Sequence, residues 1–417
     1  MSPSEPATSL SDLSLTTHGD AFGENESYVA SADAVLVHKH VSEGAMGGPG
    51  GEWAYQLYSA DSSDPVTLQL GDTADSTLIS EAVGLQQDPD ADQVVVWVTH
   101  IHRKANGLTG SSGSLQLHVF NPDGSEKGTV TAAHHVSGDS LDDESSGVMD
   151  STVVGTTAVI ATDFEEQHEV FGVDVATGRQ LWDKKCGERS GGLVGGPGIV
   201  AFQCGDSVVG IDPSSGATTW SVSSDDDALS TDSGMGGLDG ATSIPVADHV
   251  AVSGAGGNAY GILDLKNGKI VWGTAALIDS AAELGVVDFG ETDGPGPTLE
   301  VDDLKTGTTV FTLSAQQRSS LEGLTVLGAY DGRLWIWTDD GLDVVDARSG
   351  APDALAPAKV DGLQQSTNIP TAAGRTWVLL SNTDGNGDPE PTTLFQDPSG
   401  DIRAEDLPPS EITGLGG

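Results

Sequence analysis

The sequence predicts an all-β protein, and specifically an eight-bladed β-propeller built from four-stranded antiparallel blades. Three observations lead to this prediction: a phrase that recurs along the chain, an apolar run before each copy of it, and a scarcity of helical periodicity. A repeat of roughly 40 to 50 residues indicates stacked supersecondary units. Radial closure of such units leaves no long exposed sheet edge.

The recurring phrase ends an apolar run in Asp, places Gly four residues later, and places an aromatic residue four residues after the Gly. Its clearest copies, VFGVDVATGRQLW, VVGIDPSSGATTW and YGILDLKNGKIVW, contain Asp174, Gly178 and Trp182, then Asp212, Gly216 and Trp220, then Asp264, Gly268 and Trp272. Two further copies contain Asp303, Gly307 and Phe311, or Asp346 and Gly350 without a ring. Weaker echoes begin at Tyr55 or end at Gly124 and Gly400, which brings the count to eight.

Each copy is predicted to be a β-hairpin in which Gly supplies the positive φ of a D-x-x-x-G turn and the second strand ends on the ring. The apolar run upstream is expected to be an inner strand that is covered on both faces. These eight runs begin at Ala34, Val94, Thr157, Gly198, His249, Gly285, Leu334 and Thr376. An open stack of hairpins and two separate sandwiches are the alternatives, and seven blades result if the short unit from Leu284 to Leu313 merges with a neighbour.

The phrase V-x-x-x-D-x-x-T/S-G-x-x-x-W resembles the repeat of pyrroloquinoline-quinone-like β-propellers, which include the outer-membrane assembly scaffold lipoprotein and many actinobacterial envelope proteins. The resemblance spans about Phe22 to Leu407 and is clearest from Val170 to Leu313. It implies eight blades, with the Trp and Gly residues locking neighbouring blades together. For the quinoprotein dehydrogenases of this family it implies a vicinal Cys pair, a calcium site and an Asp base, and no stretch of this chain reproduces that set.

Composition divides the chain into three parts. Residues 1–20 are a Ser/Pro-rich linker, residues 21–407 a single propeller domain, and residues 408–417 a polar tail. Either LSDLSL from Leu10 or IRAEDL near Ile402 is expected to supply the strand that closes the ring. No apolar segment is long enough to span a membrane, and the start lacks the features of a signal peptide. The linker fits an ectodomain whose export signal or anchor has been removed; an authentic cytoplasmic start is the alternative.

The chain is strongly acidic, with 17 basic and 63 acidic residues and a formal net charge of −46. Such a surface repels nucleic acid and anionic lipid, so neither is an expected partner, and a membrane is expected only through a removed anchor. Solvation in a salt-rich environment and descent from a lineage with acidic exported proteins both explain the composition.

The two cysteines, Cys186 and Cys204, are predicted to lie toward the same face of the disc, one just past the strand of Trp182 and the other at the end of the next inner strand. A disulfide between them contributes about 3 kcal/mol on the chain-entropy estimate and indicates an oxidising compartment. Two buried free thiols are the alternative. The wide spacing and the lack of a second Cys pair argue against a zinc site.

Two residue sets are candidate metal ligands. Asp384, Asn386 and Asp388 form a D-x-N-x-D arrangement that suits Ca²⁺, although Pro389 stands where a calcium loop usually has Gly. His38 with His40, and His100 with His102, place imidazole pairs at equivalent positions of neighbouring blades, close to His134 and His135. Such a cluster suits Zn²⁺, Cu²⁺ or a response to pH. An ordinary hairpin loop and chance proximity of exposed histidines are the alternatives. No other cofactor is expected.

Long insertions are predicted to gather on the face opposite the tight turns, and variable loops on a rigid scaffold are where binding usually resides. They follow His38, Thr99, His134, Ser224 and Asn382. Two acidic runs within them, Asp139, Asp142, Asp143 and Glu144, then Asp225, Asp226 and Asp227, suit solvated loops or a basic partner peptide.

These observations predict a non-catalytic, extracytoplasmic propeller, secreted or anchored in the cell envelope. We expect it to bind a protein or cell-envelope component through its loop-rich, acidic face. No G-x-S-x-G elbow is present, and no catalytic residue is predicted. A ligand-sensing ectodomain of a membrane-anchored protein and a metal- or quinone-dependent oxidoreductase are the alternatives.

Overall fold

The computed structural model describes part of the chain, and that part is almost entirely β. The described residues are 26–31, 34–41, 52–59, 65–68, 77–88, 93–105, 111–121, 123–132, 147–164, 167–187, 192–205, 207–223, 246, 248–253, 260–290, 296–321, 323–338, 341–353, 363–366, 369–373, 377–383, 389–396 and 411–414. Within these ranges the chain forms strands β1 to β31 and one helical turn, α1. The prediction of an all-β protein is confirmed.

The chain divides into two compact units, which we call the N-terminal unit (Asn25–Thr274) and the C-terminal unit (Ala275–Gly417 with Met1–Glu24). In the N-terminal unit the described residues form five antiparallel sheets whose strands follow one another in sequence. These sheets are β1(Glu26–Ser31), β2(Ala34–Val41), β3(Glu52–Ser59) and β4(Val66–Leu68); β5(Thr77–Asp88), β6(Gln93–Ala105), β7(Ser111–Phe120) and β8(Glu126–Ala132); β9(Gly147–Val154), β10(Thr157–Phe164), β11(Gln167–Asp174) and β12(Gln180–Gly187); β13(Val194–Gly196), β14(Ile199–Cys204), β15(Ser207–Ile211) and β16(Thr218–Ser223); and β17(His249–Ser253), β18(Tyr260–Asp264) and β19(Ile270–Gly273).

In the C-terminal unit the described residues form three such sheets and one two-stranded sheet. They are β20(Ala275–Asp279), β21(Leu284–Asp288), β22(Pro297–Asp303) and β23(Thr308–Ser314), followed by α1(Ala315–Arg318); β24(Thr325–Tyr330), β25(Arg333–Thr338) and β26(Gly341–Asp346); β28(Ile369–Ala373), β29(Trp377–Thr383) and β30(Pro389–Gln396); and β27(Leu363–Ser366) with β31(Glu411–Gly414). Strand β31 lies in the segment that the sequence assigned to a polar tail. The unit from Leu284 to Leu313 lies in a sheet of its own, β20–β23, whereas the seven-blade alternative required it to merge with a neighbour. The number of blades stays a prediction.

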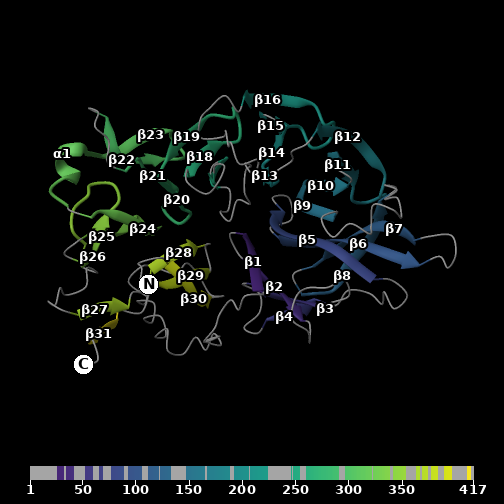
Figure 1. Cartoon of the computed structure of the whole chain (residues 1–417), viewed down its shortest axis with the longest axis horizontal. Coiled ribbons are helices and arrows are strands. Elements are labelled where there is room, and N and C mark those ends of the chain that lie inside the picture. Colours follow the sequence, from purple (N-terminus) through teal and green to yellow (C-terminus); the bar gives the residue numbers. More distant parts are fainter. Residues whose placement is uncertain are drawn as a thin grey trace, which may run out of the picture. The chain divides into compact units, whose positions relative to one another are not determined.

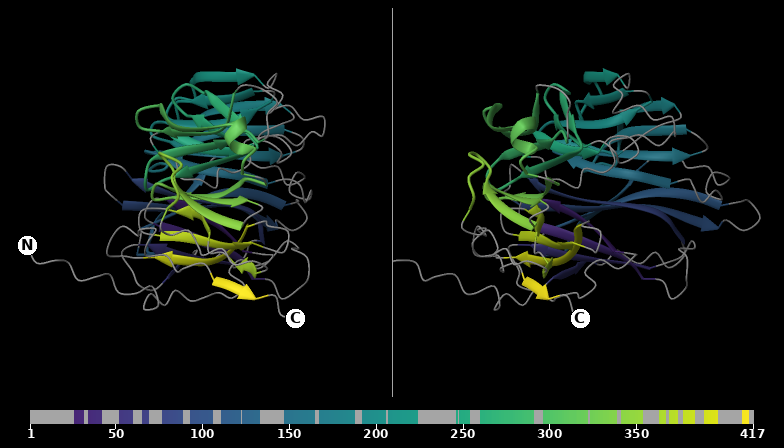
Figure 2. Two further views of the ribbon diagram at one scale, coloured as in Figure 1. Left: turned by 90° about the vertical axis from the view of Figure 1, so that its left-hand side faces the viewer. Right: turned by 60° about the vertical axis from the view of Figure 1, so that its left-hand side comes forward.

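Within each unit the sheets are arranged as a fan. The first strands β1, β5, β9 and β13 contact one another in order, as do β20, β24 and β28 in the C-terminal unit. Later strands of each sheet lie progressively farther from these first strands, and β12 and β16 are the outermost strands of their sheets (Figure 1). Seen from the side, the strands of the N-terminal unit have roughly the same axis direction from one sheet to the next (Figure 2).

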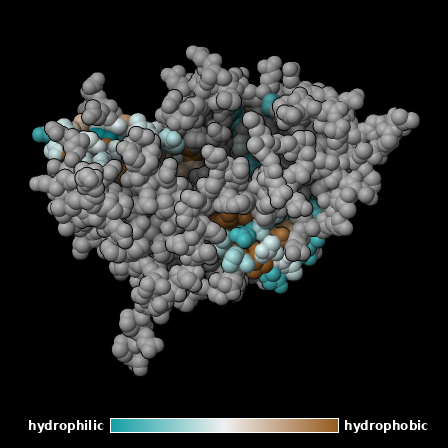
Figure 3. All heavy atoms as spheres, turned by 60° about the horizontal axis from the view of Figure 1, so that its bottom comes forward, coloured by the Kyte–Doolittle hydropathy of each residue, from teal (hydrophilic) through white to brown (hydrophobic). Residues whose placement is uncertain are grey.

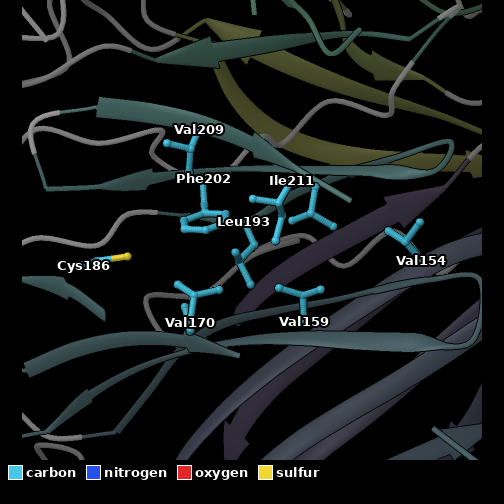
Figure 4. Close-up of a cluster of buried hydrophobic side chains, with 10 residues drawn as sticks. Val154, Val159, Val170, Cys186, Leu193, Phe202, Val209 and Ile211 are labelled. Carbon is cyan, nitrogen blue, oxygen red and sulfur yellow. The ribbon is translucent and has the colours of Figure 1, made fainter. Parts of the chain in front are cut away.

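The predicted apolar runs form the interior of the sheets. Seven of the eight lie in second strands, and the run at His249 lies in β17, the first described strand of its sheet. Residues Ile199 to Gln203 of β14 and all of β21 are buried, as expected for strands that are covered on both faces. Side chains of the sheet β9–β12 meet those of β14 and β15 in one apolar cluster that includes Val159, Val170 and Phe202 (Figure 4). Burying each of these side chains contributes roughly 1.5–3 kcal/mol.

The predicted D-x-x-x-G hairpins are confirmed in the turn after β11. The Asp174 carboxylate accepts hydrogen bonds from the N–H groups of Ala176 (3.1 Å) and Thr177 (2.8 Å). The N–H of Gly178 donates to the Asp174 carbonyl at 2.8 Å, with φ at 69°. Asp212, Asp264, Asp303 and Asp346 hold their turns in the same way. Asp therefore recurs because its short carboxylate caps the turn from within.

The aromatic residue of the phrase sits inside the fourth strand and not at its end, because β12 continues past Trp182 to Gly187. The Trp182 ring lies between two glycines, Gly172 on the paired strand β11 and Gly216 in the turn of the next sheet. Its Nε1–H donates to the Pro213 carbonyl of that turn at 2.6 Å.

The next junction repeats this arrangement. The Trp220 ring lies between Gly210 and Gly268, and its Nε1–H donates to the Leu265 carbonyl at 2.7 Å. In the C-terminal unit the Phe311 ring takes the equivalent place against Gly350. Each of these rings therefore joins its own sheet to the sheet that follows.

A disulfide joins Cys186 to Cys204, as predicted, with an S–S distance of 2.11 Å. Cys186 lies near the end of β12 and Cys204 at the end of β14, so the bond crosses between neighbouring sheets. It lies at the opposite end of the strands from the turn contacted by Trp182. This junction is therefore fixed at both ends.

We expect Gly216→Ala to destabilise the protein more than Gly155→Ala does. Both residues have positive φ, 68° and 59°, so each substitution carries a dihedral penalty of about 1 kcal/mol. A Cβ at Gly216 meets Trp182 Cδ2 at 2.6 Å, whereas a Cβ at Gly155 meets nothing within 4 Å. Overpacking raises the expected loss at Gly216 to about 3 kcal/mol. Urea unfolding followed by Trp fluorescence measures both losses, and equal values would contradict the ring-on-glycine contact.

Replacing both cysteines by Ser is expected to lower the free energy of unfolding by about 2–4 kcal/mol, because the cross-link restricts the unfolded chain. The measurement is urea unfolding of the variant beside the native chain, with and without a thiol reductant. Reductant should lower the stability of the native chain to that of the variant and leave the variant unchanged. A variant as stable as the oxidised native chain would show that this disulfide does not fix the junction.

Candidate functional site

Each sheet has two chemically different ends. Because successive strands are antiparallel, the turns after first and third strands of a four-stranded sheet lie at one end, which we call the turn end, and all other connections lie at the other, the loop end. In the sheet β17–β19 the first described strand takes the place of a second strand, so the turn after β18 at Asp264 lies at the turn end. Four of the predicted insertions include the connections at residues 42–51, 133–146, 224–245 and 384–388, in whole or in part, and all four connections join strands at loop ends. Their own structure lies outside the described residues. The expectation that long insertions gather opposite the tight turns therefore agrees with the strand order within each sheet.

One predicted insertion is largely not a loop. Of the stretch from Thr99 to Ser114, Thr99–Ala105 lies in β6 and Ser111–Ser114 lies in β7. Its Gly, Ser and Asn content is typical of loops. The two strands nevertheless pair with each other as far as Ala105 opposite Ser111. The stretch also contains no Asp or Glu, so this part of the predicted face is not acidic.

The structure places the backbone of both predicted histidine pairs. His38 and His40 lie in β2 opposite Tyr55 and Trp53, and the pair in β6, His100 and His102, lies opposite Gln116 and Ser114. Metal binding there stays a prediction. The predicted calcium ligands Asp384, Asn386 and Asp388, both acidic runs, and His134 with His135 lie outside the described residues. Among the residues that were placed, no group of three or more His, Cys, Asp or Glu could hold a metal ion.

A half-buried aspartate that the sequence did not single out lies at the junction fixed by the disulfide. Asp150 of β9 accepts hydrogen bonds from the N–H groups of Leu193, just before β13, at 2.6 Å and of Ser151 at 2.7 Å. Removal from water disfavours the charged form and raises the pKa of Asp150 to about 6, against the opposing effect of these bonds. Its chemical role is to pair a backbone N–H of the next sheet.

Asp279 has the corresponding role in the C-terminal unit. Its carboxylate accepts N–H bonds from Ala281 and Ala282 in its own turn and from Asp331 and Gly332 in the turn of the next sheet, at 2.7–3.1 Å. The side chain is 1% exposed, and burial raises its pKa. Four donors around one carboxylate leave it little capacity to bind a substrate or metal.

The loop end of the same junction contains a buried ion pair. Arg318 of α1 donates to both oxygens of Asp288, at 2.6 and 3.2 Å, and to the Thr298 and Leu324 carbonyls. Ser314 begins the helix with a capping box to Gln317. The pair therefore ties the connection after β23 to the end of β21. Breaking such a pair from one side is costly, because it leaves a buried charge without its partner.

Three cations at the turn ends of described sheets lie beside acidic groups. Lys305 contacts Glu283 at 3.4 Å, Arg348 contacts Asp303 at 3.2 Å, and Lys266 contacts Asp248. The turn end thus presents neutralised pairs around repeated short turns. On the face seen in Figure 3, hydrophilic and hydrophobic side chains of the described residues lie interspersed.

Sequence reasoning missed these junction residues for identifiable reasons. Gly172 and Gly210 stand at a constant offset before the turn Asp, which was a usable signal, but they read as ordinary strand residues. Asp150 and Asp279 are two of 63 acidic residues, and no local sequence feature distinguishes an aspartate that is removed from water.

No helix in the described part of the chain is long and apolar enough to cross a membrane.

Antiparallel sheets that fan out from adjacent first strands, three of them joined to the following sheet by a ring, form the arrangement typical of β-propeller blades. Residues 116–282 match the family model described as outer membrane protein assembly factor BamB. This match supports a pyrroloquinoline-quinone-like β-propeller family over that stretch, which is less than half of the chain. No curated protein matches the chain.

Several solved structures share a weak likeness to the chain. Sqt1 of Saccharomyces cerevisiae has 12% identity and a TM-score of 0.36 over 86% of this chain and 97% of its own. The rhamnogalacturonan lyase YesW has 10% identity and 0.36 over 89% and 82%, and the β-propeller domain of the trilobed protease from Pyrococcus furiosus has 9% and 0.35 over 89% and 97%. At these TM-scores no conclusion about this chain follows from them.

We expect Asp150→Asn to stabilise the protein at neutral pH. The pKa of Asp150 is about 6 in the folded state, compared with the ordinary value of 3.8 that we take for the unfolded chain. The folded state therefore binds the proton more tightly than the unfolded state does. Protonated Asp150 contributes fully to the free energy of unfolding below pH 4, and this contribution is lost as pH rises through 6. The difference is about 3 kcal/mol. The single oxygen of the neutral amide still accepts from the Leu193 N–H, and the variant gives up the bond from the Ser151 N–H in exchange for avoiding that loss.

Urea unfolding at pH 4, 5, 6 and 7 tests this expectation. The variant and the native chain should match near pH 4 and diverge as pH rises. Asp212→Asn is the control, because hydrogen bonds from Ser214 lower the pKa of Asp212 and give its contribution the opposite pH dependence. A variant that is less stable at pH 7 and as pH-dependent as the native chain would mean that Asp150 is ionised without penalty.

Proposed function

We propose that this protein is a non-catalytic, extracytoplasmic β-propeller of eight blades, which binds a protein or cell-envelope component through the loop end of its sheets. The observation that carries the proposal is the contrast between the two ends. Repeated short turns cover the turn end, whereas the long and varied insertions connect strands at the loop end. Sequence variation confined to one end of a rigid framework is typical of binding surfaces.

Two features support the scaffold and its compartment. The stretch that matches the assembly-factor model, residues 116–282, contains the two junctions fixed by Trp182 and Trp220. The Cys186–Cys204 disulfide lies in the same stretch and favours an oxidising compartment, because cytosolic thiols are kept reduced. A secreted or envelope-anchored location follows as part of the proposal.

The buried polar groups favour a binding role over an enzymatic one. Asp150 and Asp279 are occupied by backbone N–H groups, and Asp288 is occupied by Arg318. Groups that hold neighbouring sheets together in this way are not free to act as a general acid or base. The proposal needs no resident cofactor, and the Ca²⁺ and histidine-ligand predictions stay predictions.

Affinity capture from an envelope fraction of the source cells tests the proposal. We compare the intact chain with a loop-end variant, in which residues 139–146 become Gly-Ser repeats, and a turn-end control that carries Lys266→Ser and Lys305→Ser. A protein that is captured by the intact chain and the control, and lost by the loop-end variant, supports binding at the loop end. Equal capture by all three assigns binding elsewhere, and turnover of a substrate by the intact chain would contradict the non-catalytic role.

A further inference from the structure

The outermost strand of the sheet β17–β19 pairs differently from the outermost strands of other sheets. In four described sheets the pairing skips one residue shortly after the turn, which makes a β-bulge. The skipped residues are Lys127, Leu181, Thr219 and Val310. Between β18 and β19 the pairing has no such shift and runs from Leu263 opposite Ile270 to Gly261 opposite Trp272.

The position of one glycine accounts for the missing bulge. The turn before β19 has the same hydrogen bond, from the Asp N–H to the carbonyl five residues later at 2.9 Å, as the turns after β11 and β15. Gly172 and Gly210 stand two residues before the turn Asp, whereas Gly261 stands three before it and Ile262 takes the usual place. A Cβ at Gly261 would meet Trp272 Cε3 at 2.8 Å, so the ring needs a glycine opposite it. Pairing without a bulge brings Trp272 opposite Gly261.

Without the bulge, the Trp272 ring lies on the opposite face of its sheet, because a shift of one residue reverses the side on which every side chain lies. Trp182 and Phe311 pack in the apolar clusters that their sheets form with the sheets that follow. Trp272 packs instead in the cluster that its sheet forms with the preceding sheet, the same cluster against which Trp220 packs. Ile262 lies on the face that carries the ring in the other sheets.

The ring contacts described above all lie within one unit or the other. Trp182 and Trp220 join the last three sheets of the N-terminal unit, and Phe311 joins two sheets of the C-terminal unit. Because Trp272 packs toward the preceding sheet, the series of rings in the N-terminal unit ends inside that unit. The boundary of the unit at Thr274 comes directly after β19.

We propose that the position of Gly261 divides the protein into two cooperative units that unfold separately, with the division at Thr274. Proteins open in contiguous cooperative units, and regions with fewer stabilising contacts open at lower free energy. The C-terminal unit is expected to open first, because the Phe311 ring donates no hydrogen bond and the chain's two cysteines form their disulfide in the N-terminal unit. The N-terminal sheets then keep their structure while the C-terminal sheets open.

Hydrogen exchange of the full chain, measured by mass spectrometry in a urea series, tests this division. Peptides from residues 157–174 report on the N-terminal unit, and peptides from residues 325–346 report on the C-terminal unit. In the native chain the C-terminal peptides should exchange at a lower urea concentration than the N-terminal peptides. Gly261→Ile combined with Ile262→Gly moves the glycine to the usual position without changing the composition. This variant should form the bulge, turn Trp272 to the other face, and bring both sets of peptides to a common urea concentration.

The matched control is Ile262→Leu combined with Leu263→Ile, which leaves the glycine in place and should keep the two urea dependences separate. Trp272→Ala provides a second measurement if the glycine variant does not fold. It should shift exchange of the N-terminal peptides to lower urea and leave the C-terminal peptides unchanged. Three results would overturn the inference: exchange of both units at one urea concentration in the native chain, separate exchange in a folded glycine variant, or an equal shift of both units in Trp272→Ala.

Discussion

The structure depends on one steric constraint, the placement of an indole ring between two residues that have no side chain. No sheet of three or four strands can bury both of its faces alone, so each must lie against its neighbour, and the ring fixes how close that approach is. Trp182 fills the gap between Gly172 and Gly216, and its Nε1–H pairs with the Pro213 carbonyl, so the same contact satisfies packing and hydrogen bonding together. The same junction also contains the disulfide, the apolar cluster of Figure 4 and the hydrogen bond from the Leu193 N–H to Asp150.

The junction of the C-terminal unit meets the same constraint with different chemistry. Phe311 packs on Gly350 but has no N–H to donate, so the ring supplies packing without a hydrogen bond to the neighbouring turn. Polar contacts occur instead at Asp279, which pairs with the N–H groups of Asp331 and Gly332, and at Arg348, which reaches Asp303 and the Ala282 carbonyl. Each junction needs a side chain that fills the gap between the sheets and hydrogen-bond partners for the backbone groups of the neighbouring turn. A Trp supplies both at one junction, whereas a Phe together with Asp279 and Arg348 supplies them at the other.

How far the sequence predicted this structure differs from residue to residue for physical reasons. The turn Asp, Gly and ring were predictable because their local geometry forces them to recur at fixed offsets, and the cysteines because the hairpin pattern placed them at one end of adjacent strands. The partners of Trp182 across the strand, and the burial of Asp150, depend on tertiary contacts that no local pattern encodes. The stretch from Thr99 to Ser114 was mistaken for a loop because Gly and Ser indicate turns, whereas pairing with β5 holds β6 in a strand. Of the other predicted insertions, the structure describes the residues that continue a strand, such as Asn382 and Thr383 of β29, and their remaining residues lie outside the described part of the chain.

The direction of the ring contacts has a consequence for how the chain folds while it is being synthesised. Each ring needs a glycine that comes later in the sequence: Trp182 waits for Gly216, and Trp220 waits for Gly268. A chain that emerges from its N-terminal side therefore exposes an unfilled indole surface until the next sheet has followed, and closing one gap opens another. The tendency to aggregate during synthesis therefore depends on how quickly each sheet follows the one before it. A pause within the long connection from Ser224 to Val246 would leave the Trp220 ring uncovered for the longest time.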